Sequence, residues 1–206
     1  MKSHSLLASP HELTPQLTLS NRIVMAPMTR SMANPDGTPT ADMAAYYAKR
    51  AAAGLIITEG TVIRADATGY PCVPGIYTDS HVQAWQSVTQ AVHENNGKIF
   101  MQIWHVGRVS HPHYLNGHLP LAPSATTMSG RVSRSDDLHY GQSRAVTDKE
   151  IDALIADFAN AAVRAIEAGC DGIELHTSLL ADDSAARKHS NVLQRGLAVV
   201  TETRRL

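Results

Sequence analysis

Cysteine and long apolar runs are scarce in this sequence of 206 residues. The two cysteines, Cys72 and Cys170, lie far apart and form no Cys-x-x-Cys motif, which excludes a disulfide framework and a thiolate site for zinc or an iron–sulfur cluster. No stretch approaches the length of a membrane span, and residues 1–10 lack the apolar run of a signal peptide. We therefore expect a protein of the cytoplasm.

An excess of charge of one sign is also missing. The 18 Lys and Arg residues and the 19 Asp and Glu residues are interspersed and give a net charge of −1. No extended field favours nucleic acid or an anionic membrane surface, so a small neutral molecule is the expected partner. The hydrophobic content of 43% is typical of a globular protein, which excludes disorder as the main state.

Three times a helical pattern ends at a glycine and is followed by a short apolar run. This order of elements, together with an opening strand at 22–26, predicts an α/β fold with a parallel sheet. The capping box at 147–150 marks the clearest helix start. The three copies are the helix 41–53 with Gly54 and the strand 55–59, the helix 82–92 with Gly97 and the strand 99–104, and the helix 147–168 with Gly169 and the strand 172–176.

The connections after the strands are expected to carry the chemistry, because active-site residues of parallel barrels come from the carboxyl ends of the strands. The longest connection, residues 105–146, is rich in His, Gly, Pro and Ser. Loops of that length are commonly functional.

Several segments resemble the old yellow enzyme family, also called the NADH:flavin oxidoreductase/NADH oxidase family, and within it the N-ethylmaleimide reductase-like branch. The similarity covers about residues 10–176 and keeps the family's order of motifs. The matching segments are 21–30 (NRIVMAPMTR), 46–59 (YYAKRAAAGLIITE), 69–70 (GY), 74–75 (PG), 102–108 (QIWHVGR) and 168–176 (AGCDGIELH).

The resemblance implies a (β/α)8 TIM barrel that holds FMN and is reduced by NADPH or NADH. It also implies hydride transfer to an activated alkene, such as an enone or a maleimide, or reduction of a quinone or nitro compound. The expected activity is that of an FMN-dependent ene reductase, and no metal is expected.

The resemblance assigns roles to eight positions at the strand ends. Gln102 would contact the pyrimidine edge of the flavin, because an amide offers both a donor and an acceptor. His176 would be the catalytic donor to the substrate oxygen, and it would bind the substrate together with Tyr70 and Trp104. The remaining flavin-binding positions would be Pro27, Met28, Thr29 and Gly60.

The sequence departs from the family after His176. The family's second donor position holds Leu179, and no tyrosine follows Tyr140, so the family's proposed proton donor is absent. Water would then have to supply the proton, and loss of a positioned acid typically lowers the rate by ~10²- to 10⁴-fold.

Residues 1–180 are expected to form the N-terminal half of the barrel, truncated to about its first four β/α units, and 181–206 a divergent tail. A complete barrel needs ~250 residues, and the family's phosphate-binding groups lie in its later strands. Open edges of a half barrel favour pairing with another chain, such as a homo-oligomer. A reading-frame slip is one hypothesis for the tail, because codons for 197–203 can be chosen so that a neighbouring frame resembles a family segment.

Three alternatives stand beside this hypothesis. The first is a catalytically inactive fragment that binds no FMN or acts only through association with other chains. The second is a metal-dependent hydrolase, prompted by His105, His111, His113 and His118, which lack the spacing of a zinc site. The third, a barrel reductase with an iron–sulfur cluster, needs a cysteine cluster that the sequence lacks.

Overall fold

The computed structural model describes residues 6–176, so Leu179 and the tail 181–206 lie outside the described residues. Short 3-10 turns occupy Leu6–Ala8, Ala65–Ala67 and Pro112–Tyr114. The helices are α1 (Ala41–Ala48), α2 (Asp79–His93) and α3 (Asp148–Glu167). The strands are β1 (His11–Thr14), β2 (Leu17–Leu19), β3 (Val24–Met25), β4 (Leu55–Ile57), β5 (Thr61–Val62), β6 (Ile99–Trp104), β7 (Leu121–Ala122), β8 (Arg144–Ala145) and β9 (Gly172–His176).

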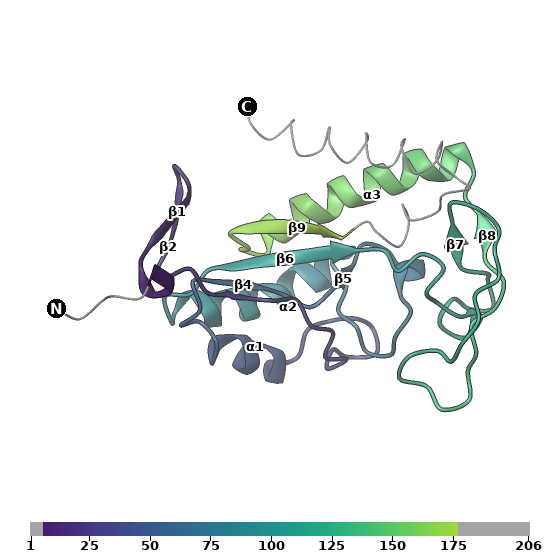
Figure 1. The fold of residues 1–206 in the computed structure, drawn as a ribbon, viewed down its shortest axis with the longest axis horizontal. Helices are drawn as coiled ribbons and strands as arrows, with labels where there is room; N and C mark the ends of the chain where they lie inside the picture. Colours follow the sequence, from purple (N-terminus) through teal and green to yellow (C-terminus); the bar gives the residue numbers. More distant parts are fainter. Residues whose placement is uncertain (1–5, 177–206) are drawn as a thin grey trace.

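The central sheet is parallel, as the sequence predicted, and five strands form it. Strands β4 and β5 both pair with one edge of β6, and β9 pairs with its other edge. The spatial order is therefore β3, then β4 with β5, then β6, then β9, which follows the chain order of a parallel barrel. Figure 1 shows β4, β6 and β9 of this sheet beside one another.

The second predicted strand, 55–59, is wrong in its extent, because the structure divides it into β4 and β5. Ile57 pairs with Phe100 and Thr61 pairs with Ile103, so four steps along one strand match three along β6. The extra residue forms a bulge at 58–60. Bulges of this kind redirect side chains and are frequent beside active sites.

One of the three predicted helices, 41–53, ends earlier in the structure than expected. Helix α1 ends at Ala48, and Gly54 is needed because an added Cβ would lie 2.0 Å from the Asn21 carbonyl oxygen. Helix α2 ends at His93, one residue beyond the predicted 92, and Asn96 adopts the left-handed conformation, with φ 58°. Gly169 has φ +89° and ends α3 as predicted, and the capping box of Thr147 and Glu150 is formed.

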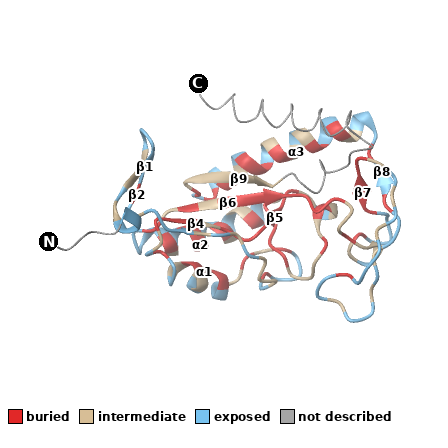
Figure 2. Ribbon diagram, viewed as in Figure 1, coloured by how far each residue is buried: buried red, intermediate tan, exposed pale blue. Residues whose placement is uncertain are grey.

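One hydrophobic core joins the sheet to the helices. Ile99, Met101 and Ile103 alternate along β6, are fully buried, and belong to one cluster of buried residues that includes side chains of all three helices. Figure 2 shows most of β6 in the colour of buried residues. Trp85 of α2 and Phe158 of α3 are fully buried in the same core. In residues 6–176 no helix has the length and apolar character that a membrane crossing requires.

The long connection between β6 and α3 lies beyond the carboxyl ends of the sheet strands (Figure 1). It contains the short parallel pair β7 and β8 and an antiparallel excursion with bridges from Thr127 to Gln142 and from Arg131 to His139. This position is where parallel barrels carry their active-site loops, and the functional role of the connection stays a prediction.

Candidate functional site

Two neighbouring strands place four side chains on one face of the sheet. In the parallel register, Gln102 of β6 lies opposite Glu174 of β9, and Trp104 lies opposite His176. Side chains two residues apart on a strand share a face, and this face is opposite to the one that packs on the helices. The Gln102 Nε2 group donates to Glu174 Oε1 at 2.6 Å, so the amide is held in one orientation.

Aromatic rings stack on one another at the carboxyl end of β6. The Trp104 indole lies between Tyr70, with ring centroids 6.0 Å apart and planes at 6°, and His176, at 5.6 Å and 27°. The structure therefore brings together the three residues predicted to bind the substrate. An acceptor-poor aromatic wall beside an imidazole donor suits a flat, conjugated molecule that carries an oxygen.

Gly60 has a packing reason that the sequence did not reveal. A Cβ at this position would lie 2.5 Å from the Trp104 indole, and the contact is with the rigid ring. The absence of a side chain at Gly60 therefore sets the position of Trp104. Its predicted contact with a flavin stays a prediction.

The strand bulge at 58–60 is built around a buried carboxylate. Glu59 is 1% exposed; the Tyr47 hydroxyl donates to its Oε1 at 3.2 Å, and the Arg30 backbone N–H donates to its Oε2 at 2.9 Å. The Tyr47 hydroxyl also accepts the Glu59 N–H at 2.9 Å. Burial raises the pKa of Glu59, and the hydrogen bonds from Arg30 and Tyr47 partly oppose that rise.

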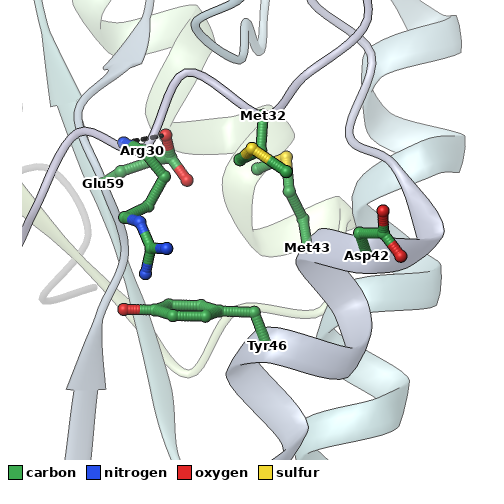
Figure 3. Close-up of a pocket in the computed structure, with 6 residues that line it drawn as sticks. All are labelled: Arg30, Met32, Asp42, Met43, Tyr46 and Glu59. Carbon is green, nitrogen blue, oxygen red and sulfur yellow. Dashed lines mark hydrogen bonds between the residues drawn. The ribbon is translucent and has the colours of Figure 1, made fainter.

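A small pocket of about 90 Å³ lies beside this carboxylate. Figure 3 shows the Arg30 guanidinium above the Tyr46 ring, with the Met32 and Met43 side chains facing each other. The guanidinium carbons of Arg30 and Arg50 lie 4.2 and 3.6 Å from the centroid of the Tyr46 ring. The residues that line the pocket are Arg30, Met32, Asp42, Met43, Tyr46 and Glu59.

Three of the residues predicted to contact the flavin lie in the segment after β3. Pro27 and Thr29 are half-buried and Met28 is 60% exposed. The carbonyl of Thr29 accepts from Arg134 Nη2 at 2.6 Å. Because these residues follow β3, they lie at the same end of the sheet as Trp104 and His176.

Three buried polar atoms in the described part of the chain have no hydrogen-bond partner: Ser31 Oγ, Trp104 Nε1 and His105 Nε2. Trp104 ends β6 and His105 follows it, whereas Ser31 lies six residues beyond the end of β3. His105 Nδ1 accepts the Gly107 N–H, so the proton is assigned to Nε2. Burial lowers the pKa of His105 to about 4, with Asp66 opposing this shift and Arg64 adding to it.

The loop histidines do not form a metal centre in residues 6–176, where no group of three or more His, Cys, Asp or Glu side chains could hold an ion. His105 is fully buried, whereas His111 caps a turn by accepting the His113 N–H at 3.1 Å. This disposition gives the metal-hydrolase alternative no support.

Sequence reasoning missed three residues that organise the site. Glu174 could have been found, because it lies two positions before His176 on the same face of the strand. Glu59 could have been suspected as an acidic residue at the end of an apolar strand. Arg134 gave no such signal, since its contact with Thr29 joins residues 105 positions apart.

The parallel sheet, its helix layer and the polar and aromatic array at the strand ends define a protein of the β/α-barrel class with a candidate site at the carboxyl ends of its strands. The chain belongs to the NADH:flavin oxidoreductase / NADH oxidase family, whose model matches residues 7–179.

Relatives and solved structures agree with this assignment. The chain is 44% identical to flavin oxidoreductase hxnT of Emericella nidulans, over 77% of this chain and 42% of the relative. It is 42% identical to 12-oxophytodienoate reductase 7 of Oryza sativa, over 82% and 44%. The old yellow enzyme homologue from Zymomonas mobilis superimposes with a TM-score of 0.83 at 34% identity, over 95% of this chain and 60% of that structure.

Morphinone reductase in complex with tetrahydroNAD superimposes with a TM-score of 0.80 at 35% identity, over 96% of this chain and 61% of the structure. The barrel fold and the family are therefore confirmed. The chain spans less than half the length of the curated relatives that it matches. The narrower N-ethylmaleimide reductase-like branch stays a prediction.

Proposed function

We propose that this chain contributes to an FMN-dependent ene reductase that uses NADPH or NADH to reduce the activated C=C bond of an enone, a maleimide or a similar electrophile. The observation that carries the proposal is the single face formed by Gln102, Trp104 and His176, with Tyr70 stacked on Trp104. The free thiols of Cys72 and Cys170 fit a cytoplasmic location.

The residues at this face fit a flavin. Within residues 6–176 the buried indole N–H of Trp104 has no acceptor, and a ligand carbonyl would satisfy it. Gln102 offers an amide that matches a ring edge with both donors and acceptors. Thr29, Pro27, Met28 and Gly60 would complete the contacts from neighbouring strand ends, and a bound FMN would supply the hydride chemistry.

His176 would act on the substrate rather than on the flavin. Its imidazole is stacked on Trp104 and therefore oriented. A donor to the substrate oxygen gains strength as negative charge develops there, so it stabilises the transition state more than the ground state. One donor of this kind is typically worth ~3 kcal/mol. Tyr70 and Trp104 would hold a planar substrate by contact with their ring faces.

Flavin uptake tests the proposal. The purified chain is mixed with FMN and desalted, and its visible absorption is recorded before and after NADPH is added. We expect retained flavin bands that bleach on reduction, and a weakened retention in Gln102→Met, which removes the amide while keeping the length of the side chain. Gln83→Met on the exposed surface of α2 is the matched control. A colourless wild-type protein would contradict the proposal.

A second reading is a chain that binds no FMN and acts only through association with other chains. It is favoured by the two outer strands, because among residues 6–176 β3 pairs only with β4 and β9 only with β6. At the β3 edge, Ile23 before the strand and Val24 within it are 53% and 48% exposed. Light scattering across a range of concentrations separates the readings: a colourless protein that assembles as its concentration rises supports the second.

A further inference from the structure

A β-hairpin forms part of the long connection that lies beyond the strand ends (Figure 1). It spans 127–142, and its two arms are joined by backbone hydrogen bonds from Met128 to Gly141 at 3.0 Å, from Val132 to Leu138 at 2.8 Å and from Tyr140 to Gly130 at 2.9 Å. We call this segment the flap. An isolated two-stranded hairpin is marginally stable in water, so contacts with the rest of the molecule must hold it in place.

One side chain of the flap hydrogen-bonds to the segment that follows β3. Arg134 donates from Nη2 to the Thr29 carbonyl at 2.6 Å and from Nη1 to the Arg30 carbonyl at 3.2 Å. A guanidinium suits this task because its donors form a rigid planar fork. Arg134 adopts φ 61°, a backbone conformation that is unfavourable for a residue with a side chain, so the contact is made at a conformational cost.

The same peptide segment is held from its other side by an acidic group. The Arg30 N–H donates to the buried Glu59 carboxylate at 2.9 Å. The backbone at Thr29 and Arg30 therefore lies between a cation that binds its carbonyls and an anion that binds its N–H. Such opposed charge-assisted hydrogen bonds leave little freedom for the peptide planes that direct the Thr29 side chain.

The flap also touches the predicted substrate wall. The Ser133 side chain lies close enough to the Tyr70 phenol to lower the pKa of that group. Burial raises the pKa of Tyr70, and the neighbouring Tyr140 adds to the rise, whereas Ser133 and the charge of Arg134 oppose it. Residues of the flap thus bind the segment that presents Thr29 and lie near the ring that stacks on Trp104.

We propose that Arg134 is a positioning residue. It fastens the flap to the segment that follows β3 and, together with Glu59, fixes the orientation in which Thr29 meets the flavin. The part that concerns the flavin depends on the proposed function, whereas the fastening of the flap does not. The role of Arg134 is to orient Thr29 through its backbone, and no proton or hydride passes through the guanidinium.

Amide hydrogen exchange of the full chain tests the fastening without any cofactor. In Arg134→Met we expect exchange in the flap and at residues 29–31 to accelerate by about tenfold or more, because a charge-assisted hydrogen bond is lost, while amides of α2 keep their rate. Arg134→Lys should recover part of the protection. Arg131→Met, an exposed arginine of the same flap, is the matched control and should leave exchange unchanged. Unaltered flap exchange in Arg134→Met would overturn the proposal.

A double-mutant cycle on FMN affinity tests the action through Thr29. Thr29→Val removes the hydroxyl but keeps the carbonyl that Arg134 binds. We expect Arg134→Met to weaken FMN binding by about tenfold in the wild-type background and by much less in Thr29→Val, since coupled residues are not additive. Equal losses in both backgrounds would overturn the positioning role. If the wild type binds no FMN, the proposed function fails, and hydrogen exchange still decides the fastening of the flap.

Discussion

The two faces of β6 carry different kinds of side chain. Toward the helices, Ile99, Met101 and Ile103 are fully buried in a hydrocarbon core. On the opposite face and at the strand ends lie Gln102 and Trp104, together with the buried polar atoms that have no partner in the described part of the chain. Cores are filled for stability, whereas unpaired polar groups lower stability and are retained where function needs them.

The comparison separates folding from function within a single strand. A change in the helix-facing layer should act mainly on the free energy of unfolding. A change at the strand ends should act on ligand binding and on the dependence of stability on pH. The three predictions below are arranged by the size of the expected effect.

Phe158→Ala should give the largest loss. Phe158 is fully buried in α3, and truncation of a buried phenylalanine typically costs about 3–5 kcal/mol because a cavity remains. Urea unfolding followed by circular dichroism measures the loss. Val163→Ala on the same helix, where the side chain is 40% exposed, should change the free energy of unfolding by less than about 0.5 kcal/mol. Similar losses in the two variants would show that α3 is not packed as described.

His105 should make stability fall in mild acid. Its pKa is lowered to about 4 in the folded chain from 6.5, so the unfolded chain binds the proton more readily. The contribution is complete above pH 6.5 and is lost as the pH falls toward about 4, by on the order of 3 kcal/mol. Urea unfolding at a series of pH values measures it.

His105→Asn should flatten this dependence, because an amide keeps an acceptor for the Gly107 N–H but does not titrate in this range. His113→Asn is the control, since His113 is exposed and its replacement should preserve the slope. A slope that survives His105→Asn would assign the acid sensitivity to another group and would weaken the contrast between the two faces of the sheet.

Much of the fold followed from local signals in the sequence. The capping box at Thr147 and the glycine that ends α3 are properties of neighbouring residues, so they could be recognised without tertiary information. The shared face of Gln102 and Trp104 follows from the two-residue period of a strand. Their alignment with His176 needs only the parallel register that the order of helices and strands predicts.

The missed features depend on contacts between distant segments. The bulge after Ile57 forms where Glu59 meets Tyr47 and the Arg30 backbone, and nothing in the apolar run itself marks a break. The path of the flap is set by Arg134 and its carbonyl partners. No periodicity governs such a loop, so its contact with the first strand could not be predicted.

Tyr47→Phe tests the contact between the helix-side core and the strand ends. It should give the smallest loss in the free energy of unfolding. The Tyr47 ring is 1% exposed in the core, and its hydroxyl reaches the Glu59 bulge at the strand end. The variant keeps the ring but leaves the Glu59 N–H and one carboxylate oxygen without this partner, at a cost of about 1–3 kcal/mol. Tyr46→Phe, which keeps the ring between the two arginines, is the control. A loss in urea unfolding as large as that of Phe158→Ala would mean that the bulge supports the core itself, and that the strand ends cannot be separated from the stability of the helix layer.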